Sequence, residues 1–199
     1  MVIEEVILES IGADTEHHAA GSTIFAEGST PSYYFQIVEG EVKLNNYNED
    51  GKEIIQDILE SGQSLGESML FMEKPYPVNA VALLSCKILK LSKQKFFQLL
   101  ESNPEKYLDM IKSISSSMYF RYIMGQYLSS QNPVSRLRAF MDYLKSLQSD
   151  STEPFTFQIP LTRQQMANFT GLCVETTIRT LKMMEREKIV KIRNHKVLY

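Results

Sequence analysis

The sequence predicts an α+β fold of three successive parts: an antiparallel β-roll, one long helix, and a helix-turn-helix completed by a small hairpin. Three observations lead to this prediction. Short β-type runs punctuated by glycine occupy the first half of the 199-residue chain. An apolar helical pattern then continues from Asn103 to about Ser130. Two further helical stretches meet at Gly171, and basic residues gather around them.

The first part, residues 1–102, is expected to be a β domain that ends in a short helix. Glycines separate its candidate strands: Gly21, Gly28, Gly40, Gly51, Gly62 and Gly66. We expect strands at residues 23–26, 33–39, 41–47, 53–59, 79–84 and 86–91, and a helix at 93–100. Strands of this length between such turns are typical of a small antiparallel barrel or roll.

Residues 103–131 are predicted to form one helix, with Pro104 at a first-turn position that tolerates proline. Apolar side chains recur along it: Tyr107, Ile111, Ile114, Met118 and, further on, Tyr122. About 26 helical residues would span about 39 Å, more than a small domain needs. Apolar residues on more than one side predict two burial partners, the β-roll and the same helix of a second subunit. Burial in a single core is the alternative.

The third part, residues 132–199, follows a polar boundary at 129–133. A helix is expected at 134–148 with an apolar face: Leu137, Phe140, Met141 and Leu144. Residues 155–159 alternate like a strand, and 189–192 and 196–199 form a plausible hairpin around three polar residues. Strands beside a helix-turn-helix predict a winged domain.

The stretch 162–182 predicts the helix-turn-helix itself. Thr162 supplies a hydroxyl N-cap for a helix at 163–169, and Gly171 lies in the turn where a positive φ is needed. A second helix, at about 174–187, is the one that such units lay in the DNA major groove. Apolar residues are expected to form the core between the helices: Met166, Ala167, Phe169, Leu172 and Leu181. Four residues fall on a different face: Val174, Glu175, Ile178 and Arg179.

The charges are distributed according to the same division. Residues 132–199 contain 11 Lys and Arg against 6 Asp and Glu, a net charge of +5. Residues 1–131 contain 10 against 18, a net charge of −8, so the overall −3 conceals a basic C-terminal part. Because phosphate binding depends on local positive charge, double-stranded DNA is the predicted partner of this part. A regulatory module whose C-terminal part contacts a protein is the alternative.

Other classes of function have little support in the sequence. The longest apolar run, about 80–84, is too short to cross a membrane, and no signal peptide opens the chain, so we expect a cytoplasmic protein without membrane contact. No catalytic constellation, metal spacing or cofactor motif is apparent, so an enzyme, a metal and a cofactor are not expected. We interpret His17 and His18 as an exposed turn, and Cys173 as a small packed thiol.

This order of parts resembles the CRP/FNR family of bacterial transcription regulators over almost the whole chain. The segment GQSLGES at 62–68 is similar to the family's β-roll and effector-pocket segment, and 161–182 is similar to its DNA-reading unit. The resemblance implies a cyclic-nucleotide-binding-type β-roll, a dimerisation helix and a winged helix. It also implies a homodimer on an inverted-repeat operator and RNA polymerase as a further partner.

The resemblance implies base readout by Glu175 and Arg179, with Val174 and Ile178 beside them. Arg179 can donate two bonds to guanine O6 and N7, and Glu175 can accept one from cytosine N4. A surface salt bridge between the two is the alternative. Phosphate contacts are implied for a second set: Thr162, Arg163, Thr176, Lys182 and Arg193. Val174, where the CRP branch has an arginine, favours a TTGA-like half-site.

An effector pocket is implied at five residues: Gly66, Glu67, Ser68, Val78 and Asn79. In cAMP-binding members a Gly-Glu pair holds the ribose and a downstream Arg-Ser pair neutralises the phosphate. The chain keeps Gly66 and Glu67, but residues 74–80 contain no arginine. Since a buried phosphate without a fixed partner is unfavourable, cAMP is not expected to bind, and the effector is left open. The FNR branch's N-terminal cysteine cluster is absent, so no iron–sulfur centre is expected.

Overall fold

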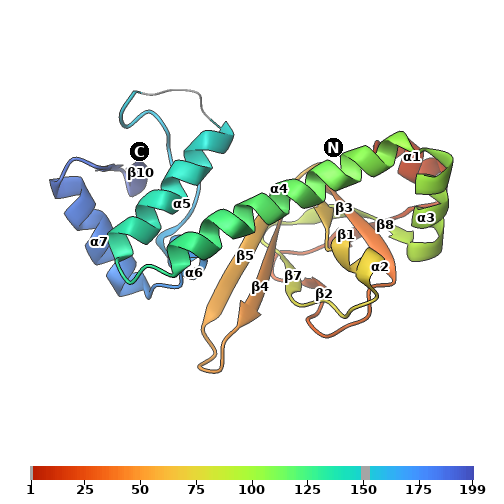
Figure 1. Cartoon of the computed structure of the whole chain (residues 1–199), viewed down its shortest axis with the longest axis horizontal. Coiled ribbons are helices and arrows are strands. Elements are labelled where there is room, and N and C mark those ends of the chain that lie inside the picture. The colour runs from red at the N-terminus through yellow and green to blue at the C-terminus, as the bar shows by residue number, and fades with distance from the viewer. Residues whose placement is uncertain (1, 149–152) are drawn as a thin grey trace. The chain divides into compact units, whose positions relative to one another are not determined.

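The computed structural model describes residues 2–148 and 153–199 and has the predicted α+β fold (Figure 1). The chain divides into two compact units, Met1–Tyr119 and Phe120–Tyr199. Within the described residues, no helix is long and apolar enough to cross a lipid bilayer.

The first unit is a roll of two four-stranded antiparallel sheets, ordered β1-β8-β3-β6 and β2-β7-β4-β5. The strands are β1 (Asp14–His18), β2 (Thr23–Phe25), β3 (Tyr33–Glu39), β4 (Glu41–Tyr47), β5 (Glu53–Glu60), β6 (Ser64–Leu65), β7 (Asn79–Ala82) and β8 (Cys86–Ser92). Alternate residues of both sheets point inwards, so that Ile37 and Ile88 meet Val42 and Leu44 in one buried core.

The prediction of a turn at His17 and His18 is wrong, although His17 is exposed as expected. Both belong to β1, which pairs with β8 along its whole length, from Asp14 opposite Lys90 to His18 opposite Cys86. Glu16 accepts from Lys90 at 2.8 Å between Nζ and Oε1, which fixes the strand on its neighbour. The sequence of β1 lacks apolar alternation because this edge strand buries little side-chain surface, so only its pairing identifies it.

A second core lies on the other side of the first sheet. There α1 (Glu5–Ser10) and α3 (Lys93–Ser102) pack together at one end of the β domain (Figure 1). Tyr34 of β3 stacks on Phe96 of α3 with 4.6 Å between ring centroids, and Leu8 is fully buried beside them. Two elements, α1 and the short α2 (Ser68–Met72), were not predicted, because six and five residues are too few to show a helical period.

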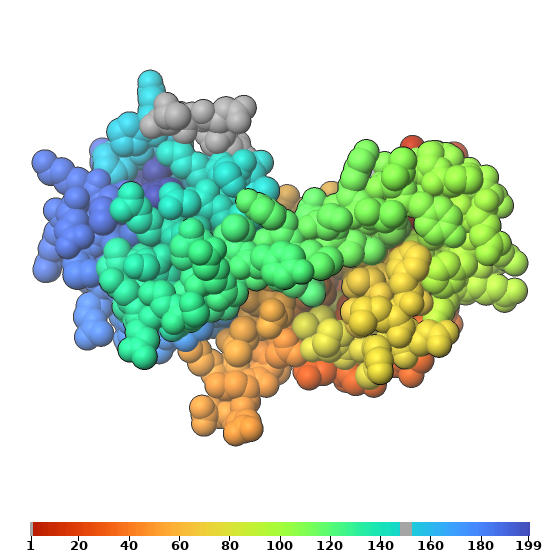
Figure 2. Space-filling model, viewed as in Figure 1, coloured from red at the N-terminus to blue at the C-terminus, as the bar shows by residue number. Residues whose placement is uncertain are grey.

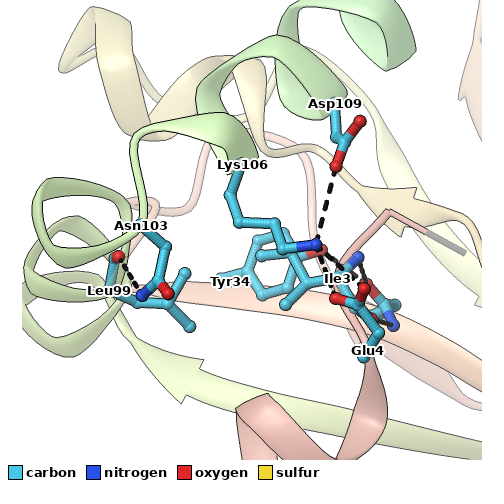
Figure 3. A network of polar contacts seen from close by, with 8 residues as sticks. Ile3, Glu4, Tyr34, Leu99, Asn103, Lys106 and Asp109 are labelled. Carbon is cyan, nitrogen blue, oxygen red and sulfur yellow. Dashed lines mark hydrogen bonds and ion pairs between the residues drawn. The ribbon is translucent and has the colours of Figure 1, made fainter.

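A polar network ties the N-terminal segment to this core (Figure 3). The amide of buried Gln36 donates to Ile3 O at 2.7 Å and accepts from Ile3 N at 3.0 Å. Lys106 Nζ lies 2.7 Å from Glu4 Oε2 and 3.6 Å from Asp109 Oδ2. The hydrogen bond from Lys106 lowers the pKa of Glu4, and the same bond raises the pKa of Lys106. The start of the chain is therefore attached to both β3 and the following long helix.

The long helix is α4 (Glu105–Leu128), whose side chains are uncovered on the face turned to the viewer in Figure 2, in green. Its apolar residues divide into two groups. Tyr107 and Ile114 are half-buried against the second core of the first unit. The other group is exposed: Leu108, Ile111, Met118, Tyr119 and Tyr122. The 4-3-4 series predicted as one seam is thus shared between the chain's own core and an uncovered face.

The second unit contains α5 (Pro133–Gln148), α6 (Arg163–Thr170), α7 (Val174–Arg186), β9 (Lys191–Arg193) and β10 (Lys196–Leu198). The predicted core between the helices is confirmed by burial: Met166, Ala167, Phe169, Leu172 and Leu181. Phe140 of α5 packs on Phe169 at 4.8 Å between centroids. The strand expected at 155–159 is not a regular strand. Phe157 and Ile159 bond to the backbone of β10 and its neighbour, but Phe155 has a positive φ of 62°.

Candidate nucleic-acid interface

The first helix of the helix-turn-helix begins at a complete capping box. Thr162 Oγ1 accepts from Gln165 N at 3.1 Å, while Gln165 Oε1 accepts from Thr162 N at 2.8 Å. Free backbone donors of the first turn are satisfied in this way. Because the Thr162 hydroxyl already accepts a hydrogen bond from Gln165 N, a phosphate bound there would have to share this hydroxyl with Gln165.

The turn between α6 and α7 depends on Gly171, whose φ of 66° is in the left-handed region. Leu172 then donates its N–H to Ala167 O at 3.1 Å, which closes the end of α6. Arg136 of α5, a residue that the sequence reading missed, donates from Nη1 to Thr170 O at 3.1 Å. The end of α6, where the turn begins, is therefore held by α5. A lone arginine in a predicted helix offers no sequence signal for such a contact.

Helix α7 has one buried and one exposed face. Thr177, Leu181 and Met184 are buried, which fixes the helix on the core. The exposed residues lie in a stripe three or four positions apart: Glu175, Ile178, Arg179 and Lys182. Val174 and Thr176 are half-buried at the start of the helix. The structure thus places the base-reading candidates together on the outer surface, where a long groove of nucleic acid could receive them.

Cys173 precedes this stripe as the N-cap of α7. The interpretation as a small packed thiol is wrong, because the side chain is exposed. Its Sγ lies 2.9 Å from Thr176 Oγ1, and this hydrogen bond lowers the pKa of the Cys173 thiol. Thr176, predicted as a phosphate contact, is therefore engaged with Cys173. Whether the side chain of a helix N-cap is buried depends on the elements around it. Within the described residues, no element covers the side chain of Cys173.

The wing is attached to the helices by two polar contacts. Arg163 Nη1 donates to His195 O at 2.7 Å, and Ile192 N donates to Glu185 Oε1 at 2.9 Å. Partial burial lowers the pKa of Arg163. The predicted phosphate residue Arg163 thus holds the hairpin tip, where His195 has a positive φ of 61°. Arg193 remains exposed on β9.

The predicted effector segment lies inside the β-roll. Gly66 has a φ of 63°, and a Cβ added there would lie 2.7 Å from Tyr76 Cε1 and 3.0 Å from Phe25 Cζ. The rings of Tyr76 and Phe25 stack at 3.8 Å between centroids, and Tyr76 is 3% exposed. Aromatic side chains therefore fill the space above Gly66. Burial, followed by the nearby charge of Glu67, raises the pKa of Tyr76 to about 12.

The remaining residues of the predicted effector pocket occupy defined positions in the β-roll. Ser68 opens α2, and Val78 is buried in the inter-sheet core. Asn79 Oδ1 accepts from Glu27 N at 2.9 Å, and its Nδ2 donates to Asn45 O at 3.3 Å. Glu67 is 7% exposed. Of the five residues, Glu67 and Val78 are buried, and Gly66, Ser68 and Asn79 are half-buried.

A β-roll followed by a long helix and a winged helix-turn-helix, whose second helix has an exposed outer face, defines a two-domain DNA-binding regulator. Family models agree with each part: residues 15–103 match the cyclic nucleotide-binding domain, and 135–198 match the Crp-like helix-turn-helix domain. The chain belongs to the CRP/FNR family of bacterial transcription regulators. The members of this family are regulators rather than enzymes.

Individual relatives extend this comparison. The chain is 30% identical to the cAMP-activated global transcriptional regulator CRP of Salmonella typhimurium over 174 residues, covering 85% of this chain and 81% of that protein. The fold is similar to the c-di-GMP responsive regulator CLP of Xanthomonas campestris, with a TM-score of 0.80, 18% identity and 98% coverage of both chains. A CooA mutant from Carboxydothermus hydrogenoformans gives a TM-score of 0.83 at 16% identity, covering 98% of this chain and 87% of the other.

Proposed function

We propose that the protein binds an inverted-repeat operator as a homodimer and reads its sequence with α7. The exposed stripe of Glu175, Ile178, Arg179 and Lys182 is the observation that supports this most directly. Glu175 and Arg179 are one turn apart, so a guanine and the cytosine paired with it lie within their joint reach. Val174 and Ile178 supply only apolar contacts, consistent with a TTGA-like half-site.

Phosphate contacts are assigned to the residues around the stripe. Lys182 and Arg193 are exposed and free to approach the backbone of the duplex. Thr162, Arg163 and Thr176 each have an intramolecular partner, so we assign them mixed roles, in which they shape the interface and share a donor with the phosphates.

The dimer is proposed to form through the uncovered face of α4. Five large apolar side chains on this face are between about one-half and two-thirds exposed: Leu108 61%, Ile111 56%, Met118 47%, Tyr119 62% and Tyr122 69%. Such a stripe on one helix is unfavourable in water, and a second copy of the same helix would bury it. Tyr107 and Ile114 would support the interface from the chain's own core.

The β-roll is not expected to respond to cAMP, although the Salmonella relative is cAMP-activated by name. A cyclic phosphate would need a cationic partner, and residues 74–80 contain no arginine. The ring of Tyr76 lies against Gly66 where space for a ligand would be required. The residues present therefore do not fit a cyclic nucleotide, and Gly66, Glu67, Ser68, Val78 and Asn79 would serve another effector or a structural role.

These proposals assign a separate role to each of the three parts of the chain. Residues 1–102 form the sensor or effector domain, 103–131 the dimerisation helix and hinge, and 132–199 the DNA-binding domain. RNA polymerase is the protein partner expected from family membership. Regulation of chromosomal genes implies a cytoplasmic location.

The central experiment is a salt titration of binding to duplex DNA that carries an inverted TTGA repeat. If Lys and Arg displace counterions from phosphates, log Kd should change with log salt with a slope of several units. A slope near zero would instead favour the alternative, a regulator whose C-terminal part contacts a protein. Calorimetric titration with cAMP and cGMP tests the effector proposal, and micromolar binding that tightens DNA affinity would contradict it.

A further inference from the structure

The second unit contains a groove between the start of α6, the exposed face of α7 and the wing, with a volume of about 510 Å³. We propose that this groove binds a small anionic amphiphile, a molecule with one anionic head, such as a carboxylate, on an apolar chain. Its volume is within the range of small-molecule sites, about 300–1,000 Å³. This proposal assigns a ligand site that is separate from the β-roll and that overlaps the surface of α7 proposed to meet DNA.

The lower part of the groove is apolar. Leu181 of α7 is 1% exposed, and Leu161 and Ile192 are half-buried beside it, so three separate segments supply this floor. Ile178 continues the apolar surface to the edge of the groove and is 39% exposed. An isoleucine in an otherwise polar stripe leaves apolar surface in water, and an apolar chain lying on the floor would cover it.

The rim of the groove is cationic. Lys182 and Lys196 are exposed on opposite sides, and Arg163 and His195 lie at the junction of α6 and the wing. The bond from Arg163 to His195 O joins α6 to the wing and fixes the guanidinium among the residues that line the groove. Among the described residues that line the groove there is no Asp or Glu. This charge favours an anionic head and disfavours a cationic one.

The position of the groove gives the ligand a regulatory consequence. Ile178 and Lys182 belong both to the groove and to the stripe proposed to meet DNA. A ligand seated there would prevent α7 from approaching the duplex, so ligand and DNA should compete. The competition rests on the proposed function, whereas binding of the ligand does not.

The site is tested on the full chain without DNA, by calorimetric titration with butanoate, hexanoate and octanoate, and with octanol as the uncharged match. Affinity should rise about threefold to fourfold for each added methylene group. Octanoate should bind about tenfold more tightly than octanol. Equal binding of butanoate and octanoate, or of octanoate and octanol, would overturn the proposal.

Variants locate the two halves of the ligand. Ile178→Ser should weaken the dependence on chain length, and Lys196→Gln should reduce the preference for octanoate over octanol, each with a loss of about two- to fivefold in octanoate affinity. Met183→Ser on α7 and Lys191→Gln on β9 are exposed matched controls outside the groove and should bind octanoate as wild type does. Identical losses in variants and controls would contradict the assignment.

Competition is measured by fluorescence anisotropy of labelled operator DNA with rising octanoate. Once the octanoate concentration exceeds the Kd of the protein for octanoate, the apparent Kd for DNA should increase in proportion to that concentration. Octanoate binding together with unaltered DNA affinity would overturn the regulatory consequence. If DNA does not bind even without octanoate, the proposed function fails, while the chain-length and variant results still decide the ligand site.

Discussion

At the residue scale, Arg179 and Lys182 lie three positions apart on α7, and both side chains are exposed. Their chemistry differs, because arginine presents a planar fork that matches guanine, whereas lysine is a flexible point charge suited to phosphate. Substituting these two positively charged residues one at a time therefore tests base readout and general attraction to DNA separately.

Arg179→Ala should cost roughly 1–3 kcal/mol of operator binding and relax the preference at one base pair of each half-site. Lys182→Ala should weaken binding to all sequences and reduce the salt slope by about one unit. Competition binding against a library of half-site variants measures both effects. Equal losses that are independent of sequence in the two variants would show that Arg179 does not read a base.

Tyr76 provides a second test at this scale, because its contribution comes from the ring. Tyr76→Ala should lower the free energy of unfolding by about 3–5 kcal/mol through the cavity left above Gly66. Tyr76→Phe keeps the ring and loses only a hydroxyl 3.5 Å from Tyr33 O, so about 1 kcal/mol or less is expected. Urea unfolding of both variants and of wild type, followed by a signal from the β-roll, measures these two losses in the free energy of unfolding. A large loss in Tyr76→Phe would mean that the hydroxyl, rather than the ring, fills the essential role.

At the scale of single elements, α6 depends on its first turn. Thr162→Ala removes the acceptor for Gln165 N and should cost about 0.5–2 kcal/mol of local stability, while Thr162→Ser retains the oxygen and most of the stability. Hydrogen exchange of the α6 amides measures the difference. Unchanged exchange in Thr162→Ala would show that packing alone holds the helix start.

The attachment of the N-terminal segment to α4 should depend on pH. The pKa of Glu4 is lowered by its bond from Lys106, so this stabilisation is present above the unfolded pKa of Glu4 and is lost as pH falls through the folded value. The pKa of Lys106 is raised, so the pair also loses its effect as pH rises through that value. Glu4→Gln should therefore lower Tm at neutral pH, and its Tm should converge on that of wild type as pH falls through the folded pKa of Glu4.

Glu9→Gln, an exposed change in α1, the helix that begins directly after Glu4, is the matched control and should follow the Tm of wild type through the pH series. Thermal unfolding in a pH series compares the three proteins. A Tm deficit of Glu4→Gln that stays constant over the whole acid range would exclude the ion pair as its cause.

At the scale of the whole molecule, the exposed face of α4 determines whether the protein acts as a dimer. Replacing Ile111 and Met118 with Asp would place charges in the proposed interface, where they have no partner. The variant should sediment as a monomer and lose affinity for the inverted repeat, because two recognition helices about 34 Å apart are no longer available together. Val6→Asp, at a 76% exposed position of α1, should remain dimeric. A wild-type monomer at micromolar concentration with full operator binding would contradict the dimer.

Local sequence was sufficient for much of this architecture. Strands β3 and β4 and the helix-turn-helix were predicted closely, because apolar periodicity, the Thr162 cap and the positive φ of Gly171 are properties of a few neighbouring residues. That Glu175, Ile178 and Arg179 share one face of α7 was also predictable, since residues three and four apart share a face of any helix.

Contacts between distant residues were decided only by the tertiary structure. Strand β1 exists because β8 lies beside it, and Tyr76 closes the space above Gly66 because its ring stacks on Phe25 of β2. Folding also decides which half of α4 is covered by the core of its own chain. The bond from Arg163 to His195 likewise joins two elements that are distant in sequence and that both line the groove. Periodicity describes which side chains share a face, but burial depends on what packs against that face, and no short stretch of sequence contains this information.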